Sequence, residues 1–373
     1  MLITEQLVFI ACFFLSLGFF AYIYIAYPFW SHMPVMHTPY AWVQKLCSTA
    51  GNPIEKIPYR NKYVKTQLYQ TLYAEDAKPQ FIDIMHCCYL PSDSILCTVD
   101  DKKFDTIFSG HVQTPYITIC ANACIASLPL TIGNKNIYTV SYLASADKEI
   151  TRQLLSTHIF NCRRKTPEIK SFLYKLYGSS STGAVPLLTF TTHLYYLDTQ
   201  VSNKSQLPPV QQIYKNNWSF IYSVIDTINA SHKFTTWLSP AALKTRVDAG
   251  FLWVFAILEP LSGSVLAAYF LEDAMTLYEN LDYGKMGINL VGSYKSAAVS
   301  VGDFYKGLLK CIQIVQKQNL DYIMLTVDDV GHNAYLLPML SPMLIKKTEG
   351  SYILINMYFS DDVDRANAFL YGF

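Results

Sequence analysis

The hydrophobic pattern of the chain begins with one uninterrupted apolar run, LVFIACFFLSLGFFAYIYIAYPFW, over residues 7–30. At about 1.5 Å per residue, a helix of this length can cross the hydrocarbon core of a bilayer. Only Glu5 precedes the run as a charged residue and no small-residue cleavage pattern follows it, which argues against a cleaved signal peptide. The pattern therefore predicts a transmembrane helix in the segment 1–30.

Basic residues flank this run on one side only. No Lys or Arg precedes it, and the basic residues that follow it are Lys45, Lys56, Arg60, Lys62 and Lys65. By the positive-inside rule the chain is a single-pass membrane protein whose body faces the cytoplasm. Three Asn-x-Ser triplets, at residues 203, 217 and 229, would be glycosylated in a lumenal body, but such triplets are frequent by chance.

The pattern after the run predicts a linker and then a first folded half. Residues 31–61 are rich in Pro, His and small polar side chains, as in a juxtamembrane linker, and the body begins near Lys62. VKTQLYQTLYAED has helical spacing. YITICANACIASLPLTI and NIYTVSYLA are typical of two strands joined by the turn GNKN, and a helix over residues 149–162 follows. The half ends in the strand-like VPLLTFTTHLYYL.

A polar segment with PPV divides the chain, so we expect one half over residues 62–205 and a second over 206–373. The second half has a helix near residues 219–228, a helix opened by Ser239-Pro240 and the strands FLWVFAILEP and GSVLAAYFLED. The helix VGDFYKGLLKCIQIVQKQ and the strand LDYIMLTVD follow. Both halves contain a hairpin, a helix and another strand, which suggests an internally duplicated α+β architecture.

Composition narrows the functional classes. The formal net charge of +1 leaves no basic footprint for nucleic acid. The nine cysteines have no metal-like spacing and are interpreted as buried small apolar residues, and the scattered histidines form no ligand pair. No Walker loop, dinucleotide fingerprint, zinc-protease motif or nucleophile elbow is present. The pair Asp328-Asp329 ends an apolar strand and is either a base or the cap of the next helix.

The stretch YTVSYLASADKEITRQLLSTHIF, residues 138–160, carries the most informative pattern. A strand ends at Tyr142-Leu143 and a helix with basic residues opens a few positions later. A bulged strand end exposes backbone N–H groups to a carbonyl oxygen, and a helix N-terminus takes phosphate, which together build an acyl-CoA site. The same pattern also fits an ordinary strand, turn and helix with exposed Lys and Arg side chains.

The chain resembles the glycylpeptide N-myristoyltransferase family over about residues 62–373. The family has a strand ending in Asn-Phe-Leu and then a basic loop that grips CoA phosphates; here SYL ends the strand, with DKEITRQL in the place of the loop. LYGS stands where the family has Val-Tyr-Thr-Ala, and LDYIMLTVDD and EGSYILINMYF are similar to two of its later strands. The resemblance implies two tandem GNAT-like (acyl-CoA N-acyltransferase) subdomains that form a saddle-shaped sheet with flanking helices.

The resemblance also implies a site. The carboxylate of Phe373 would be the catalytic base, and the backbone amides of Tyr142 and Leu143 would stabilise the thioester oxyanion. Long-chain acyl-CoA, such as myristoyl-CoA, would be a co-substrate with no permanently bound cofactor or metal, and the partner would be the N-terminal glycine of a protein. The expected acyl-CoA contacts are Lys148, Thr151, Arg152, Gln153 and Leu154, and the expected substrate contacts are Ser141, Gly178, Ser179, Thr192 and Leu194.

Departures from the family pattern leave a second function open. Ser141 and Gly178 replace an Asn and a Thr that hold the glycine amine in the family, and Ile150 and Gln153 replace two of its cations. The chain is therefore predicted to be an N-myristoyltransferase-like acyltransferase or, alternatively, a catalytically inactive membrane-tethered binding or scaffold protein with the same fold. An acyltransferase that acts on a small amine or a lysine fits the superfamily but not the C-terminus.

Overall fold

The computed structural model of the chain describes residues 2–26, 58, 60, 62–88, 95–145, 147–178, 186–197, 208–278, 285–319, 321–357 and 363–371. Its helices are α1 (Leu2–Ala26), α4 (Ala74–Cys88), α5 (Asp101–Phe108), α6 (Lys148–Lys165), α7 (Phe220–Ser231), α8 (Pro240–Asp248), α9 (Val301–Gln318) and α10 (Leu337–Leu340). Short 3-10 helices are η1 (Lys215–Asn217), η2 (Gly331–Tyr335), η3 (Ser341–Met343) and η4 (Arg365–Asn367).

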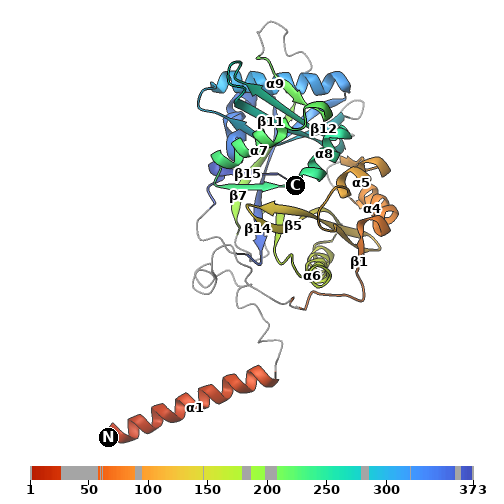
Figure 1. Cartoon of the computed structure of the whole chain (residues 1–373). Helices are drawn as coiled ribbons and strands as arrows, with labels where there is room; N and C mark the ends of the chain where they lie inside the picture. Colours follow the sequence, from red (N-terminus) through yellow and green to blue (C-terminus); the bar gives the residue numbers. More distant parts are fainter. Residues whose placement is uncertain are drawn as a thin grey trace.

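The apolar N-terminal segment forms α1, which stands apart from the body in Figure 1. The predicted helix is confirmed, but it begins before residue 7 and ends at Ala26. Across the described residues, no helix combines the length and the hydropathy of a membrane span. The structure therefore does not support the predicted transmembrane anchor. The predicted linker, residues 31–61, lies outside the described residues except for 58 and 60.

The described strands form one sheet of fifteen. Its main path runs β1-β3-β4-β5-β6-β14-β7-β13-β12-β11-β10-β8, and β2, β9 and β15 join at its sides. The strands are β1 (Gln70–Tyr73), β2 (Ile95–Cys97), β3 (Tyr116–Cys120), β4 (Ala123–Ile132), β5 (Lys135–Ser145), β6 (Phe172–Tyr177), β7 (Leu188–Tyr196), β8 (Gln211–Ile213), β9 (Phe234–Trp237), β10 (Leu252–Leu258), β11 (Val265–Tyr278), β12 (Lys285–Lys295), β13 (Tyr322–Asp328), β14 (Leu344–Ile355) and β15 (Ala368–Leu370).

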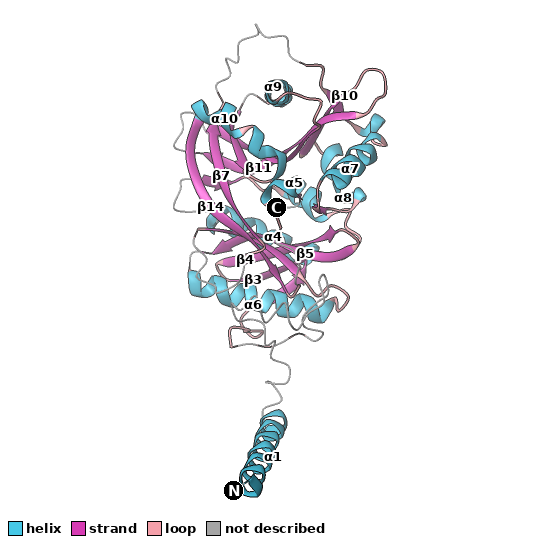
Figure 2. Ribbon diagram, turned by 90° about the vertical axis from the view of Figure 1, so that its left-hand side faces the viewer, coloured by secondary structure: helices cyan, strands magenta, loops and turns pink. Residues whose placement is uncertain are grey.

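Two stretches of the chain repeat the same order of elements. In the first, the antiparallel hairpin β4-β5 leads through α6 to β6, which pairs parallel with β5. In the second, the hairpin β11-β12 leads through α9 to β13, which pairs parallel with β12. Helices α6 and α9 lie at opposite ends of the body in Figure 2. The duplicated order of elements predicted from the sequence is confirmed, and one predicted helix is wrong, because residues 64–76 contain β1 and only the start of α4.

The two repeats exchange their last strands. β7 follows β6 in the chain but pairs with β13, and β14 follows β13 but lies between β6 and β7. The sheet is therefore continuous across the middle of the molecule, where β7 and β14 run between its upper and lower parts (Figure 2). The predicted boundary at residues 205–206 lies outside the described residues, so the division into 62–205 and 206–373 stays a prediction.

Helix α9 illustrates why these segments fold as they do. Ser300 caps it, because the Ser300 side chain accepts a hydrogen bond from the backbone N–H of Asp303. Its apolar residues recur at helical spacing and are buried against the sheet, where each full burial of a large side chain contributes about 1.5–3 kcal/mol. These residues are Phe304, Leu308, Cys311, Ile312 and Val315.

The C-terminal segment runs through the centre of the body. β15 pairs parallel with β9, and β9 in turn pairs antiparallel with β4 of the first repeat. The ring of Phe369 stacks on Trp237 with a centroid separation of 4.7 Å. Tyr371 is fully buried, and Thr236 Oγ1 binds both its backbone N–H and its carbonyl oxygen. The tail is thus a buried strand through Tyr371, while Phe373 lies outside the described residues.

Candidate functional site

The first feature of the site is a bulge near the end of β5. Cys124 of β4 pairs with Ala144 and Ala126 pairs with Ser141, so Tyr142 and Leu143 together oppose a single residue of β4. Tyr142 has a φ of 54°, which is uncommon for a residue other than glycine. Such a bulge disrupts the ladder of backbone hydrogen bonds and turns the strand.

The bulge lies where β5 and β6 separate. Their parallel pairing ends at Val140 and Tyr174, and both strands continue beyond it. Tyr142 packs its ring against Phe81 and Phe108, with centroids 6.1 Å apart in each pair. The predicted oxyanion donors, the amides of Tyr142 and Leu143, therefore belong to residues of β5 that lie beyond its last pair with β6, and their role stays a prediction.

The second feature is the N-terminus of α6. The helix predicted over residues 149–162 is confirmed as α6, and residues 148–154, which stand in the place of the family's basic loop, form its first two turns. Asp147 is the N-cap, and its Oδ1 accepts a hydrogen bond of 2.8 Å from the backbone N–H of Glu149. Asp147 is a favourable N-cap, which fixes the start of the helix at Lys148. The carboxylate of Asp147 therefore already accepts a hydrogen bond from one of the backbone amides that a phosphate would use.

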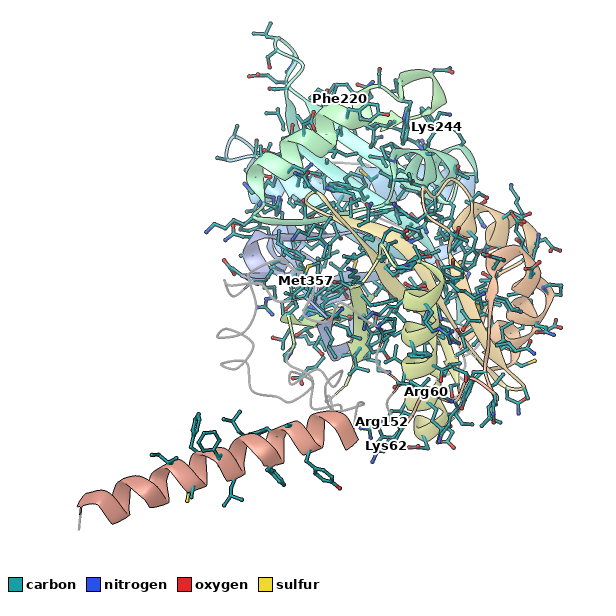
Figure 3. The ribbon with its side chains drawn as sticks, turned by 60° about the horizontal axis from the view of Figure 1, so that its bottom comes forward. Arg60, Lys62, Arg152, Phe220, Lys244 and Met357 are labelled. Atoms are coloured by element: carbon teal, nitrogen blue, oxygen red, sulfur yellow. The ribbon has the colours of Figure 1, made fainter. Side chains whose placement is uncertain are left out.

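The predicted acyl-CoA contacts are distributed around this helix start. Thr151 donates its hydroxyl to the carbonyl oxygen of Asp147 at 2.9 Å, and Gln153 donates to Glu149 at 3.0 Å. The Arg152 guanidinium lies 3.8 Å from the ring centroid of Tyr63 and is exposed near the edge of the body (Figure 3). Leu154 is fully buried in the core. The side chain of Lys148 is not described.

The predicted substrate contacts that the structure describes lie on β5, at the end of β6 and on β7. Gly178 has a φ of 82° and donates its N–H to the carbonyl of Glu349. Leu194 lies half-buried on β7, and Ser179 is outside the described residues. The hydroxyl of Ser141 is buried and has no hydrogen-bond partner among the described residues.

Thr192 belongs to a polar cluster around Asp328. Lys175 Nζ lies 2.6 Å from Asp328 Oδ2, Thr192 donates to Oδ1 at 2.6 Å, and Tyr352 donates to Oδ2 at 3.0 Å. Burial, the largest single effect, lowers the pKa of Lys175, but Asp328 together with Tyr177 and Tyr352 outweighs it, and the pKa lies well above its ordinary value. Lys175 is the first residue of β6 after its last pair with β5.

Sequence reasoning missed Lys175 and Tyr352. The only signal for Lys175 was one charged residue inside the apolar strand FLYKLY. The sequence offered Asp328-Asp329 as a base or as the cap of the next helix, and both interpretations are incomplete. Asp328 is held in the polar cluster, and the next helix, η2, has no side-chain cap. Asp329 accepts from the backbone N–H of Thr191 at 2.7 Å and from Arg365 at 2.8 Å.

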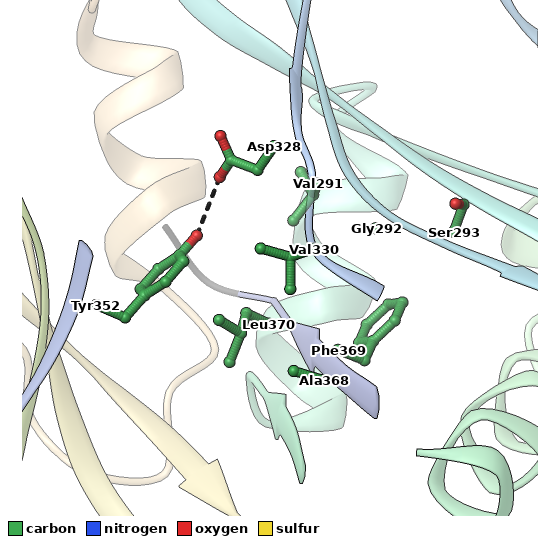
Figure 4. Close-up of a pocket in the computed structure, with 9 residues that line it drawn as sticks. All are labelled: Val291, Gly292, Ser293, Asp328, Val330, Tyr352, Ala368, Phe369 and Leu370. Atoms are coloured by element: carbon green, nitrogen blue, oxygen red, sulfur yellow. Dashed lines mark hydrogen bonds between the residues drawn. The ribbon is translucent and has the colours of Figure 1, made fainter. Parts of the chain in front are cut away.

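A small cavity adjoins this cluster. It lies where β12 and β13, the parallel pair of the second repeat, stop pairing. The pairing of β12 with β13 ends at Leu290, and Val291 is the extra residue of a bulge opposite β11. The cavity is about 240 Å³, open solvent included, and the tail forms one of its walls (Figure 4). Its lining residues are Val291, Gly292, Ser293, Asp328, Val330, Tyr352, Ala368, Phe369 and Leu370.

A buried ion pair interacts with Tyr371 of the tail and with Tyr142 of the bulge. Arg246 of α8 and Glu272 of β11 form a 2.6 Å ion pair, with their side chains 3% and 6% exposed. Burial raises the pKa of Tyr371, Glu272 adds to the rise, and Arg246 opposes it. The Tyr142 phenol also interacts with both Arg246 and Glu272. Tyr371 of the tail and Tyr142 of the bulge thus both interact electrostatically with the same buried ion pair.

Comparison with solved structures identifies the fold. No family sequence model matches the chain, and no curated protein sequence matches it. It is similar to the Saccharomyces cerevisiae N-myristoyltransferase solved with bound myristoyl-CoA, with 12% identity, a TM-score of 0.65, and coverage of 87% of this chain and 96% of that one. A second structure of that enzyme gives a TM-score of 0.64 at 11% identity, covering 87% and 91%.

The chain has the N-myristoyltransferase fold. The resemblance seen in the sequence is therefore confirmed at the level of architecture, as a mixed α+β fold with one large sheet. Within this fold, the Arg246–Glu272 pair interacts electrostatically with both Tyr142 of the β5 bulge and Tyr371 of the tail. The comparison leaves the roles of individual residues as predictions.

Proposed function

We propose that this chain is an N-myristoyltransferase-like acyltransferase that moves a fatty acyl group from a long-chain acyl-CoA to the N-terminal glycine of a protein. The observation that carries the proposal is the course of the tail: β15 pairs with β9, which pairs with β4 of the first repeat, and the last described residue, Tyr371, is fully buried. The yeast enzyme with this fold is described with bound myristoyl-CoA, which supports acyl-CoA as the co-substrate.

The proposed chemistry uses backbone groups at the bulge. The amides of Tyr142 and Leu143 donate hydrogen bonds to the thioester carbonyl oxygen as it gains negative charge. One such donor contributes on the order of 3 kcal/mol in other enzymes. The α-carboxylate of Phe373 takes a proton from the glycine ammonium, and the freed amine attacks the thioester carbon. The carbon–sulfur bond then breaks, and the proton that the nitrogen loses as it becomes an amide passes to the CoA thiolate. An α-carboxyl group is ionised at neutral pH, so it can accept that proton.

The chain's own residues would also hold the CoA moiety. The exposed Arg152 offers a positive charge near the start of α6, and the side chain of Asp147 turns away from its N-terminal amide when a phosphate takes its place. Single-pass membrane localisation with the body in the cytoplasm stays a prediction of the sequence.

The test is turnover with a defined acceptor. The full chain is incubated with myristoyl-CoA and a peptide that begins with glycine, while released CoA thiol and acylated peptide are measured. We expect both products in equal amounts, and none with the same peptide acetylated at its glycine. Two glycines appended after Phe373 move the carboxylate away, and turnover is expected to fall by about 100-fold or more. Absence of both products across varied peptides and chain lengths would contradict the proposal.

One observation favours a second function, a binding or scaffold protein that keeps the fold without catalysis. Asp147 and Glu149 place two carboxylates at the helix start where CoA phosphates would lie, and like charges repel. Calorimetry separates the two functions. A scaffold gives no binding of myristoyl-CoA, or binds the acyl chain without release of CoA, whereas the transferase binds and turns over.

A further inference from the structure

The ladder between β12 and β13 ends early, and side chains bond to the backbone beyond it. The last paired residues are Leu290 and Val327, although β12 continues to Lys295 and β13 to Asp328. We call this end of the two strands, from Leu290 and Val327 onwards, the fork. Buried backbone groups that leave a ladder need other hydrogen-bond partners. The 3-10 helix η2, which follows β13 in the chain, supplies them.

Asn333 of η2 joins the two strands of the fork. It is 2% exposed. Its Nδ2 donates to the carbonyl oxygen of Leu290 on β12 at 3.4 Å and to that of Asp328 on β13 at 3.2 Å. Its Oδ1 accepts a hydrogen bond of 2.6 Å from the hydroxyl of Ser293. A carboxamide has two N–H donors and one oxygen acceptor, so this side chain uses all three groups to hold the strands at one separation.

The neighbours of Asn333 connect η2 both to the fork and to the tail. His332 Nδ1 accepts a hydrogen bond of 2.8 Å from the backbone N–H of Lys295, the last residue of β12. Gly331 has a φ of 59°, and a Cβ at this position would collide with the carbonyl oxygen of Ala368 in β15. η2 therefore binds the fork through its side chains and lies directly against the backbone of the tail.

The fork and the tail also face one cavity. Ser293 and Asp328, which both bond to Asn333, line it together with residues 368–370 of the tail (Figure 4). β15 is three residues long and pairs with β9. Because so short a strand depends on packing for its stability, its position depends on the surfaces that the fork and η2 present to it.

We propose that Asn333 is a positioning residue that fixes the separation of the fork strands and thereby the place of the tail, which ends in the α-carboxylate of Phe373. The part of this proposal that concerns catalysis rests on the proposed function, in which that carboxylate is the base. Asn333 acts through the tail, because its carboxamide is fully used within the fold.

The experiment compares Asn333→Ala with the matched control Gln316→Ala in the full chain. Gln316 is also a buried carboxamide, and its Nε2 donates to the carbonyl oxygen of Tyr322 at 2.9 Å, at the other end of β13. If Asn333→Ala does not fold, Ser293→Ala replaces it, because it removes only one of the three hydrogen bonds of Asn333.

Hydrogen exchange of the C-terminal peptide, followed by mass spectrometry, measures how firmly the tail is held. The peptide includes the amide of Tyr371, which donates to Thr236 Oγ1 at 2.8 Å. Urea unfolding gives the global stability of each variant, so that exchange through local opening of the tail is separated from exchange through global unfolding.

We expect the tail amides of Asn333→Ala to exchange about tenfold or more faster than those of the control. With myristoyl-CoA and a glycine peptide, kcat should fall by a similar factor while KM for myristoyl-CoA is unchanged, because β5 and α6 are untouched. Tail exchange no faster than in the control, or faster exchange with unchanged kcat, overturns the proposal. If the original chain shows no turnover, the proposed function fails, and exchange alone decides whether Asn333 places the tail.

Discussion

At the scale of single residues, the backbone of the site depends on a few positions with unusual requirements. Tyr142 adopts a left-handed conformation at the bulge, and Gly292 lies directly against the ring of Phe369. The sequence predicted a strand end at Tyr142-Leu143, but β5 continues to Ser145 and these two residues form a bulge within it. It gave no sign of Gly292, because the contact joins residues far apart in the chain.

Gly292 is expected to tolerate no side chain. A Cβ at this position would lie 2.6 Å from Phe369 Cε2, and the ring cannot move freely because it stacks on Trp237. Gly292→Ala is predicted to lower the free energy of unfolding by about 1–3 kcal/mol and to lower acyl transfer with it, since the tail is displaced. Urea unfolding and CoA release measure the two effects.

The control is Gly302→Ala in the first turn of α9, where a Cβ meets only Ser300 Oγ at 3.8 Å. Its stability should be unchanged or raised by up to about 1 kcal/mol, with unchanged turnover. Equal behaviour of the two variants would show that the tail does not need the space at Gly292.

His158 makes stability depend on pH. It is fully buried, its Nδ1 lies 2.7 Å from Thr118 Oγ1, and burial lowers its pKa from about 6.5 to about 3. The unfolded chain therefore binds a proton that the folded chain excludes. The contribution of the neutral, buried His158 to the free energy of unfolding is complete above pH 6.5. It is lost as the pH falls from there towards 3, by about 1.4 kcal/mol per pH unit.

His158→Gln should remove this slope while leaving the other titrating groups in place. The free energy of unfolding in urea is measured for both proteins between pH 8 and pH 5. Above pH 7 it should change with pH equally in the two proteins, and below pH 6.5 it should fall less steeply in the variant. Parallel declines over the whole range would show that His158 is not excluded from protonation in the folded chain.

At the scale of elements, much of the fold follows from local patterns. The hairpin around GNKN, the helix near residues 149–162, the Ser239-Pro240 cap and the strand LDYIMLTVD all appear as β4-β5, α6, α8 and β13. Their signals are turn residues, caps and apolar spacing, which act within a few residues. The exchange of β7 and β14 and the cluster around Asp328 were not predictable, because they depend on strand order in space.

The start of α6 is the proposed site of the CoA phosphates. Asp147→Ala removes the cap and is predicted to lower stability by about 1 kcal/mol. It also removes a carboxylate from the proposed phosphate site, so calorimetry should show myristoyl-CoA binding several-fold more tightly. The control Ser300→Ala deletes the equivalent cap of α9 and should lower stability without any change in affinity. Unchanged or weaker binding in the Asp147 variant would place the phosphates elsewhere.

At the scale of the whole molecule, the described body is one sheet whose two repeats are joined by exchanged strands and by the tail. The predicted return of the tail to the middle of the body is confirmed through Tyr371. The resemblance to a known family supplied that expectation, because hydrophobic pattern alone cannot say where a terminal strand pairs. The Arg246–Glu272 pair could not be foreseen, since its partners are far apart in sequence and each looks like a surface residue.

The N-terminal helix is predicted to be dispensable for folding. α1 stands apart from the body in both views, and its large apolar side chains from Ile10 to Tyr22 are at least half exposed. Removal of residues 1–57 should change the melting temperature by less than about 2 °C and should raise solubility, because that exposed surface is lost. A drop of many degrees would show that α1 packs on the body.

The central claim is that an acyl-CoA binds with its thioester at the β5 bulge. The most direct measurement is a crystal structure of the chain with a ketone analogue of myristoyl-CoA, in which a methylene separates the carbonyl from the sulfur. We predict that the carbonyl oxygen lies about 2.9 Å from the backbone nitrogens of Tyr142 and Leu143, with the phosphates at the start of α6. An analogue bound away from the opening between β5 and β6, or absent at saturating concentration, would contradict the account.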